Sequence, residues 1–412
     1  MGFSTLGINE NLLKAVISQG YDEPTPIQTS AIPVILSGKD IMAGAQTGTG
    51  KTAAFALPLL QKITEQESKN HILKTLVLTP TRELAQQVHK SFETYSQFTQ
   101  IKSTLAYGGV SIKTQVKALK SGADILVATP GRLFDHIVNG TVDLSHIEYL
   151  VFDEADRMLD MGFIDEINRI LKRLPPKRQT LLFSATFDEA IFKLSKTLLK
   201  NPELIEVNQR NTAAAQVEQV VYNVDADRKR ELVSHLIGSK NWQQVLIFTR
   251  TKQGADALAK EMCKDGLKTQ SIHGDKSQGA REKALQEFKS GKTRVLVATD
   301  VAARGLDIQQ LSYVINYELP YIAEDYIHRI GRTGRAGSTG LAISLLSSEE
   351  NWLLEQVENV IKNRLPQQWL PGYEPDLSKK TIKDDFKNTR SAQKRRIKKR
   401  TFGEKIGHKR SR

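Results

Sequence analysis

The sequence predicts an α/β fold of two tandem domains, each a mostly parallel sheet with helices on both faces. Short apolar runs rich in β-branched residues alternate with longer amphipathic stretches, which is typical of βαβ units. This alternation occurs twice along the 412 residues. A chain of this length also exceeds the size at which a single core usually divides.

Each half contains five expected strands. In the first half they lie at 40–44, 75–80, 124–130, 149–156 and 179–186, with helices such as 82–98 between them. In the second half they lie at 244–251, 268–275, 293–300, 313–320 and 340–346, with helices at 251–266 and 280–291. A small, polar stretch between the halves is typical of a linker. The expected division is 1–207, a linker at 208–216, 217–370 and a tail at 371–412.

Charge separates the tail from the rest of the chain. Residues 378–412 contain 15 Lys and Arg against 3 Asp and Glu, and the first 377 residues are almost neutral. Such a segment has too few apolar residues to form a core and is expected to be disordered. Its cations predict salt-dependent contacts with the phosphates of a polyanion, although a purely solubilising tail is the alternative. The single Cys263 excludes an internal disulfide and is typical of a reducing cytoplasm.

A phosphate-binding loop follows the first expected strand and precedes a helix. Its backbone N–H groups and the helix N-terminus can surround phosphate oxygens. Lys51 can reach the terminal phosphates, and the Thr52 hydroxyl can bind Mg²⁺. The nucleotide-binding residues expected here are Ala45, Gln46, Thr47, Gly48, Thr49, Gly50, Lys51 and Thr52, with Ala45 where the general pattern has glycine.

Two adjacent carboxylates, Asp153 and Glu154, end the strand expected at 149–156. Taken alone, this acidic stretch also suits a solvated turn. Downstream of a phosphate-binding loop it instead predicts catalysis. Asp153 would hold Mg²⁺ through water, and Glu154 would orient and deprotonate the attacking water.

Together with five further motifs, these resemble the ordered motif set of the DEAD-box RNA helicases. The set is AQTGTGKT (45–52), PTRELA (80–85), TPGR (129–132), DEAD (153–156), SAT (184–186), ATDVAARGLD (298–307) and HRIGRTGR (328–335). The residues of these motifs are most similar to those of the bacterial RhlE-type subgroup. The resemblance implies two RecA-like domains that close on ATP and RNA.

The resemblance also assigns the contacts to the nucleotide. Gln28 would pair with the adenine edge, because its amide offers both a donor and an acceptor. Tyr21 would stack on the ring, and Thr25 would add a hydrogen bond. In the second domain, three further residues are implied. Asp307 would contact the ribose, and Arg332 and Arg335 would act as arginine fingers.

An RNA-backbone surface and a coupling set are implied in the same way. The RNA residues are Pro80, Thr81, Arg82, Gly109, Thr129, Gly131, Arg132 and Thr299. Backbone contacts carry no base information, so low sequence specificity follows. The coupling residues, which would link the ATP state to the grip on RNA, are Asp156, Ser184, Thr186 and His328.

The sequence therefore predicts an ATP-dependent RNA helicase that uses ATP and Mg²⁺ and separates RNA duplexes locally. A cytoplasmic monomer without membrane contact is expected, with ribosomal or RNA-decay proteins as further partners. Two alternatives are a DNA-translocating helicase and a non-enzymatic RNA-binding scaffold. Lys51, Asp153 and Glu154 are all present, which argues against the scaffold.

Overall fold

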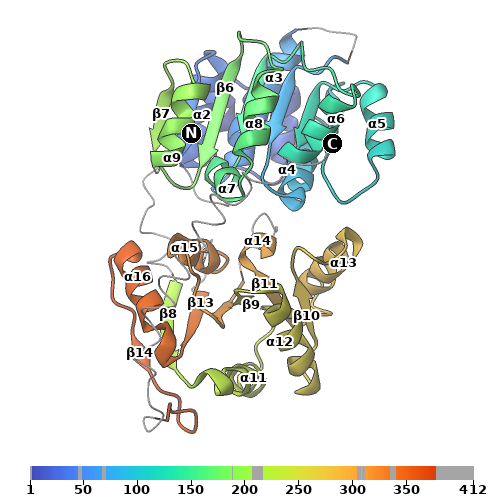
Figure 1. Cartoon of the computed structure of the whole chain (residues 1–412). Coiled ribbons are helices and arrows are strands. Elements are labelled where there is room, and N and C mark those ends of the chain that lie inside the picture. The colour runs from blue at the N-terminus through green and yellow to red at the C-terminus, as the bar shows by residue number, and fades with distance from the viewer. Residues whose placement is uncertain are drawn as a thin grey trace, which may run out of the picture.

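The computed structural model describes residues 2–44, 49–66, 71–187, 189–206, 217–303, 308, 311–334 and 340–376. It contains two stacked α/β domains, each built on a seven-stranded sheet (Figure 1). Neighbouring strands run parallel in both sheets. This confirms the predicted fold of two RecA-like domains. The expected linker 208–216 lies outside the described residues.

The sheet of domain 1 has the strand order β3-β4-β2-β5-β6-β1-β7. Its strands are β1 (Ile41–Gly44), β2 (Thr75–Leu78), β3 (Ser103–Ala106), β4 (Ile125–Ala128), β5 (Tyr149–Phe152), β6 (Gln179–Ser184) and β7 (Glu203–Glu206). Its helices are η1 (Phe3–Leu6), α1 (Glu10–Ser18), α2 (Pro26–Leu36), α3 (Lys51–Glu65), α4 (Arg82–Tyr95), α5 (Ile112–Lys120), α6 (Pro130–Val138), α7 (Ala155–Asp160), α8 (Ile164–Leu171) and α9 (Glu189–Leu198).

Two separate cores cover the faces of this sheet. Alternate residues of a strand point to opposite faces, and along β1 Ile41 joins the core under α1 to α4, whereas Met42 joins the core under α6 to α9. In the first core, the Phe55 ring of α3 lies 5.3 Å from the ring of Phe183 on β6. Both-sided burial explains why the central strands are continuous apolar runs.

Domain 2 repeats the plan with the order β10-β11-β9-β12-β13-β8-β14. Its strands are β8 (Val217–Asn223), β9 (Val245–Thr249), β10 (Thr269–Ile272), β11 (Val295–Thr299), β12 (Tyr313–Asn316), β13 (Gly340–Leu346) and β14 (Gln367–Gln368). Its helices are η2 (Ala226–Arg228), α11 (Lys229–Ser239), α12 (Lys252–Lys264), α13 (Gln278–Lys289), α14 (Asp300–Ala303), α15 (Glu324–Ile330), η3 (Ser348–Glu350) and α16 (Asn351–Ile361).

Four strands are absent from the sequence prediction: β3, β7, β8 and β14. They lie at or next to the edges of the two sheets, where one side of a strand stays polar. Three of the four residues of β7 are exposed, for example, so no apolar run marks it.

The predicted start of the tail at residue 371 is too early. Leu370 and Tyr373 pack against the hydrophobic core under α11 and α12, so the folded domain continues to at least residue 376.

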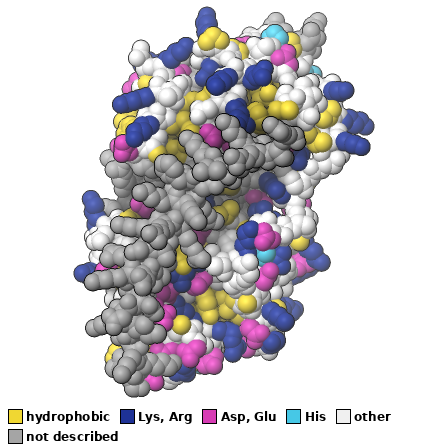
Figure 2. Space-filling model, viewed as in Figure 1, with side chains coloured by type: hydrophobic (Ala, Val, Ile, Leu, Met, Phe, Trp, Pro, Cys, Tyr) yellow, Lys and Arg dark blue, Asp and Glu magenta, His cyan; other side chains and the backbone are white. Residues whose placement is uncertain are grey.

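Charged side chains are spread over the surface of both domains. Figure 2 shows Lys and Arg scattered over the visible face and interspersed with Asp and Glu, as expected for a nearly neutral folded part. In the part of the chain that the structure describes, no helix is long and apolar enough to cross a membrane.

Candidate functional site

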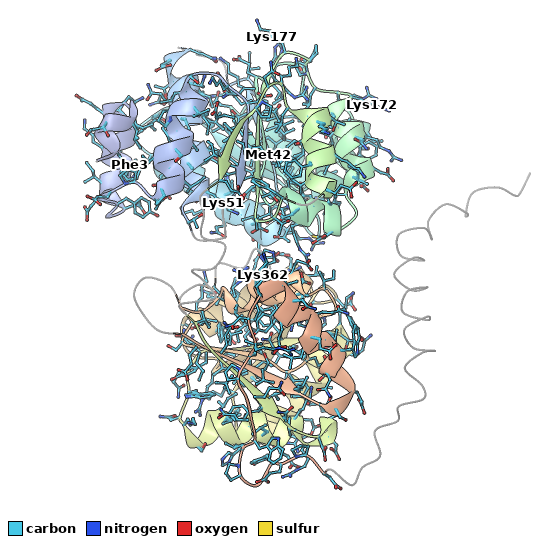
Figure 3. All side chains as sticks on the ribbon, turned by 90° about the vertical axis from the view of Figure 1, so that its left-hand side faces the viewer. Phe3, Met42, Lys51, Lys172, Lys177 and Lys362 are labelled. Atoms are coloured by element: carbon cyan, nitrogen blue, oxygen red, sulfur yellow. The ribbon has the colours of Figure 1, made fainter. Side chains whose placement is uncertain are left out.

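The predicted motifs gather at the edge of the domain 1 sheet where its strands end. The strands β5, β6 and β1 are neighbours, and their ends lead into the DEAD, SAT and phosphate-loop motifs; we call this the ATP half. The strands β3, β4 and β2 are also neighbours and lead into the motifs assigned to RNA; we call this the RNA half. In Figure 3, Lys51 lies at the end of domain 1 that faces domain 2.

The described part of the phosphate loop is held in place by the residues assigned to adenine. Thr25 Oγ1 donates to the Thr49 carbonyl at 2.8 Å, and Gln28 Nε2 donates to the Gly50 carbonyl at 3.1 Å. Gln28 Oε1 also accepts from the Thr25 backbone N–H, within the capping box of α2. Gln28 therefore contacts the loop directly.

Gly50 is required by this close approach. Its φ is 90°, a left-handed conformation, and it caps the N-terminus of α3. A Cβ at this position would lie 2.4 Å from Gln28 Nε2. Lys51 begins the helix, and within the described part of the chain its buried Nζ has no hydrogen-bond partner. Thr52 follows on the first turn of α3.

The DEAD motif places two buried carboxylates beside Lys51. Asp153 is 2% exposed, and its Oδ1 has no hydrogen-bond partner in the ranges that the structure describes. Burial raises its pKa to about 6, against the opposing charge of Lys51. Burial also raises the pKa of Glu154, which adopts the left-handed φ of 56°. Buried charges without partners are costly, so this arrangement fits a site that is completed by Mg²⁺ and phosphate.

The SAT motif is bonded to the last residue of the DEAD motif. Asp156 Oδ2 accepts from the backbone N–H groups of Ala185 and Thr186 at 3.1 and 3.2 Å, and from Thr186 Oγ1 at 3.3 Å. Ser184 Oγ instead donates to the Thr186 carbonyl at 2.8 Å. From domain 2, His328 reaches the same region. Burial lowers its pKa to about 4, and the Asp156 charge opposes that shift.

Arg332 of domain 2 interacts electrostatically with Glu154, which places a cation of domain 2 at the ATP half. It is almost fully buried. Its neighbour Arg329 was missed by the sequence reasoning and is 1% exposed. The Arg329 guanidinium forms two bonds to Asp300, at 2.6 and 2.8 Å, and a further bond to Asn316. It therefore fixes this segment of domain 2 and is not available to a ligand.

In the RNA half, two of the assigned residues form hydrogen bonds within domain 1. Thr81 Oγ1 caps α4 by accepting from the Leu84 N–H at 3.2 Å. Arg132 Nη1 donates to the Val110 carbonyl at 3.0 Å. Arg82 lies on Gly109, where a Cβ would come within 1.8 Å of its Nη1. The remaining residues assigned to RNA end strands or begin helices: Pro80 after β2, Thr129 and Gly131 at the start of α6, and Thr299 at the end of β11.

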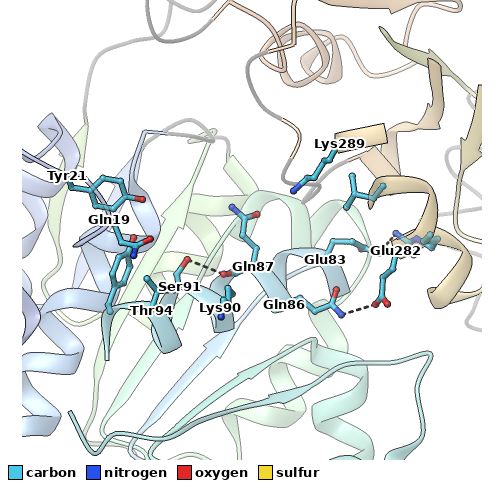
Figure 4. Close-up of a pocket in the computed structure, with 13 residues that line it drawn as sticks. Gln19, Tyr21, Glu83, Gln86, Gln87, Lys90, Ser91, Thr94, Glu282 and Lys289 are labelled. Atoms are coloured by element: carbon cyan, nitrogen blue, oxygen red, sulfur yellow. Dashed lines mark hydrogen bonds and ion pairs between the residues drawn. The ribbon is translucent and has the colours of Figure 1, made fainter. Parts of the chain in front are cut away.

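An ion pair joins the two domains beside the RNA half. Arg281 Nη2 of α13 lies 2.7 Å from Glu83 Oε1 of α4, although the groups are not aligned as a hydrogen bond. Next to it, Gln86 Nε2 donates to Glu282 Oε1 at 3.0 Å. A groove of about 400 Å³ runs along this contact, and its far end is lined by Tyr21 (Figure 4). The sequence analysis did not predict this pair.

Some of the residues predicted to contact the nucleotide lie outside the described part of the chain. They are Ala45, Gln46, Thr47, Gly48, Asp307 and Arg335.

Comparison with known proteins decides the family. The DEAD/DEAH box helicase family matches residues 25–194, and the helicase conserved C-terminal domain matches residues 228–337. The ATP-dependent RNA helicase CshA of Listeria monocytogenes is 45% identical over 363 residues, which cover 88% of this chain and 69% of that protein. The DEAD-box ATP-dependent RNA helicase RhpA of Helicobacter pylori is 41% identical, with coverage of 93% and 77%.

The chain belongs to the DEAD-box ATP-dependent RNA helicases. Among solved structures, Dbp5 of S. cerevisiae bound to RNA and ADP BeF3 matches this helicase with a TM-score of 0.80 and 30% identity, covering 96% of this chain and 99% of that one. Mss116p bound to ssRNA and AMP-PNP matches with a TM-score of 0.80 and 28% identity, covering 90% and 78%. The helicase is accordingly an ATP-hydrolysing enzyme.

Proposed function

We propose that this helicase separates RNA duplexes locally, by closing its two domains on ATP and one RNA strand, without long translocation. The observation that carries the proposal is the charge cluster shared between the domains. Glu154 of domain 1 interacts with Arg332 of domain 2, and Asp156 with His328. A catalytic site that needs both domains makes hydrolysis depend on closure, and coupling between ATP and RNA is then reciprocal.

In this proposal the ATP half binds the nucleotide and Mg²⁺. Among the described residues, no group of three or more His, Cys, Asp or Glu side chains could hold a metal ion. Mg²⁺ needs no such cage, because it usually keeps several waters and binds one or two carboxylates together with phosphates. Asp153 and Thr52 would hold it, and bound Mg²⁺ would neutralise phosphate charge. Glu154 would deprotonate the attacking water.

The remaining nucleotide contacts complete this site. Lys51 and the N–H groups of residues 45–52 would bind the phosphates, and Arg332 and Arg335 would stabilise the transferring phosphoryl group. Gln28, with Tyr21 and Thr25, would select adenine, and Asp307 would bind the ribose. The bonds of Gln28 to the phosphate loop support this, because base recognition and loop geometry would share one side chain.

In the RNA half, the assigned residues would hold one strand by its backbone, as Arg82 and Arg132 are fixed side by side at neighbouring strand ends. The basic segment 378–412 would add affinity by tethering RNA near the clamp. The residues of its motifs support assignment of the chain to the RhlE-type subgroup. Its setting would be the cytoplasm, as a monomer, with ribosome assembly or RNA turnover as the process.

The test compares RNA with DNA as activator of ATP hydrolysis, and short with long duplexes as unwinding substrates. Stimulation by RNA alone, with unwinding that falls steeply with duplex length, is expected. Equal stimulation by DNA, with unwinding that is independent of length, would support a translocating DNA helicase instead.

A truncated protein lacking 378–412 tests the tail. It should keep its turnover at saturating RNA but need more RNA for half-maximal stimulation. Its salt dependence should also be flatter, by about 0.7 in log–log slope for each phosphate that the tail would otherwise neutralise.

A further inference from the structure

A short loop of the RNA half, residues 107–110, is attached to domain 1 at both of its ends. Gln115 Nε2 donates to the Tyr107 carbonyl at 2.8 Å, and Arg132 Nη1 donates to the Val110 carbonyl at 3.0 Å. Gln115 is itself buried. The backbone of this segment, which we call the glycine loop, is therefore positioned by side chains of its own domain.

Two side chains of α4 contact the same loop. Arg82 lies against Gly109, where a Cβ would come within 1.8 Å of its Nη1. Gln86 Nε2 donates to the Tyr107 hydroxyl at 3.0 Å. Residues four apart lie on one face of a helix, so Arg82 and Gln86 contact the loop from the same side. The glycine loop and the proposed RNA contact Arg82 thus form one unit.

Gln86 also reaches domain 2. Its Nε2 donates to Glu282 Oε1 of α13 at 3.0 Å (Figure 4). Gln278 Nε2, one turn earlier on α13, donates to the same oxygen at 3.0 Å and so holds the carboxylate in place. A primary amide has two N–H donors, so Gln86 can bond the Tyr107 hydroxyl and the Glu282 carboxylate together. These bonds, which we call the closure network, connect the glycine loop to domain 2.

The closure network makes the order of the loop depend on the arrangement of the domains. The Gln86–Glu282 bond exists only while α13 lies beside α4. Fixing a glutamine side chain costs rotamer entropy, and once Glu282 holds the amide, the bond to Tyr107 requires little further ordering. The Tyr107 hydroxyl is therefore held more firmly when the domains are closed than when they are apart.

We propose that Tyr107 is a positioning residue that couples domain closure to the grip of the glycine loop and Arg82 on RNA. It acts through the loop, and its route is separate from the contacts between Asp156 and the SAT motif. The inference rests on the proposed function, in which closure of the two domains holds one RNA strand. Because such coupling is reciprocal, RNA that holds the loop also favours closure.

The experiment measures the affinity of the full-length protein for a fluorescent single-stranded oligouridylate, by anisotropy, with and without AMP-PNP. The decisive quantity is the gain in RNA affinity that AMP-PNP produces. Tyr107→Phe removes only the hydroxyl, so this gain should fall about two- to ten-fold, whereas RNA affinity without nucleotide should change much less. In ATPase titrations, the RNA concentration for half-maximal stimulation should rise by a similar factor, with a much smaller change in kcat.

Tyr149→Phe is the matched control. The Tyr149 hydroxyl also accepts from a glutamine, Gln66 Nε2 at 3.3 Å, but it lies at the start of β5, the opposite end of that strand from the site. This variant should keep the whole gain. Glu282→Ala removes the domain 2 end of the closure network and should lower the gain by a similar factor to Tyr107→Phe. In the double variant the two losses should not add, because both changes break the same network.

The outcomes separate this inference from the proposed function. If wild type gains RNA affinity with AMP-PNP and Tyr107→Phe keeps the whole gain, the inference fails and the clamp stands. An equal loss of affinity with and without AMP-PNP would also overturn it, because the hydroxyl would then only stabilise the loop. Additive losses in the double variant would show that Tyr107 and Glu282 act separately, which contradicts the closure network. If wild type shows no gain, the proposed clamp fails and takes this inference with it.

Discussion

The ATP half and the RNA half lie on the same sheet edge but differ in the groups that surround their charged side chains. In the ATP half, Lys51 Nζ and Asp153 Oδ1 are buried and have no hydrogen-bond partner among the residues that the structure describes. In the RNA half, Thr81 caps a helix and Arg132 bonds a backbone carbonyl. Arg132 Nε also has no hydrogen-bond partner among the described residues, but it lies 3.4 Å from Asp135 Oδ2. The ATP half therefore holds buried carboxylates whose pKa is raised by burial, while the arginine of the RNA half is paired with a carboxylate. We expect substitutions in the first to change turnover and those in the second to change affinity.

The largest effect is expected for Glu154→Gln. It keeps the shape of the side chain but removes the base, so hydrolysis in a single turnover should fall by about 10²–10⁴-fold. ATP and RNA binding should persist, because Asp153 and Lys51 are intact. Glu148→Gln, an exposed carboxylate just before β5, is the matched control. Turnover within a few-fold of wild type would remove Glu154 from the mechanism.

The next effect concerns the Glu83–Arg281 ion pair, which joins the two domains beside the RNA half. Arg281→Glu places two carboxylates together, and loss of one partner of a buried pair costs about 3–5 kcal/mol. Domain closure, followed by fluorescence energy transfer between dyes on the two domains, should then require far more ATP and RNA. The exchanged double variant Glu83→Arg with Arg281→Glu should recover part of the closure. No recovery would mean that each residue acts alone.

A smaller effect is expected for Gln28→Ala. The change leaves the Gly50 carbonyl and the Thr25 N–H without their partner, at a cost of about 1–3 kcal/mol. ATP affinity should fall, and discrimination against GTP should fall with it. Gln61→Ala removes an equally buried amide that binds the Asn9 N–H, away from the site, and controls for stability. Unchanged discrimination would place nucleotide selection elsewhere.

The smallest effect on turnover is expected in the RNA half. Arg82→Ala should raise the RNA concentration for half-maximal stimulation a few-fold, reduce the salt slope by about 0.7, and leave saturated turnover unchanged. Gly109→Ala should behave similarly, because its Cβ would displace the Arg82 guanidinium. The exposed Arg173→Ala serves as control. A fall in saturated turnover instead would erase the distinction between the halves.

The sequence predicted those parts of the fold that depend on local pattern. Central strands such as β4, buried on both faces, are continuous apolar runs and were found. The edge strand β7 has one buried residue in four and was not. Residues 371–376 were assigned to the tail. Only packing against Arg228 and His235 reveals that Tyr373 is folded.

The candidate site, like the fold, contains residues that the sequence predicted and residues that it did not. Lys51, Asp153 and Glu154 follow from motifs after strands, because a strand end defines where a side chain lies. The Glu83–Arg281 pair depends on how two domains meet, which no local pattern contains. Arg329 has the same type and spacing as its neighbouring arginines, and only its bonds to Asp300 distinguish it.

The central claim, that the ATP half holds buried charge in need of a ligand, is tested most directly by thermal unfolding of Asp153→Asn without nucleotide. The folded pKa of about 6 lies above the ordinary 3.8, so the charged carboxylate destabilises the fold above about pH 6. That penalty disappears as the group is protonated toward pH 4. The variant should therefore be more stable than wild type at pH 8, by about 1–3 kcal/mol, and the difference should close as the pH falls. A variant that is less stable at pH 8, or a difference independent of pH, would contradict the account.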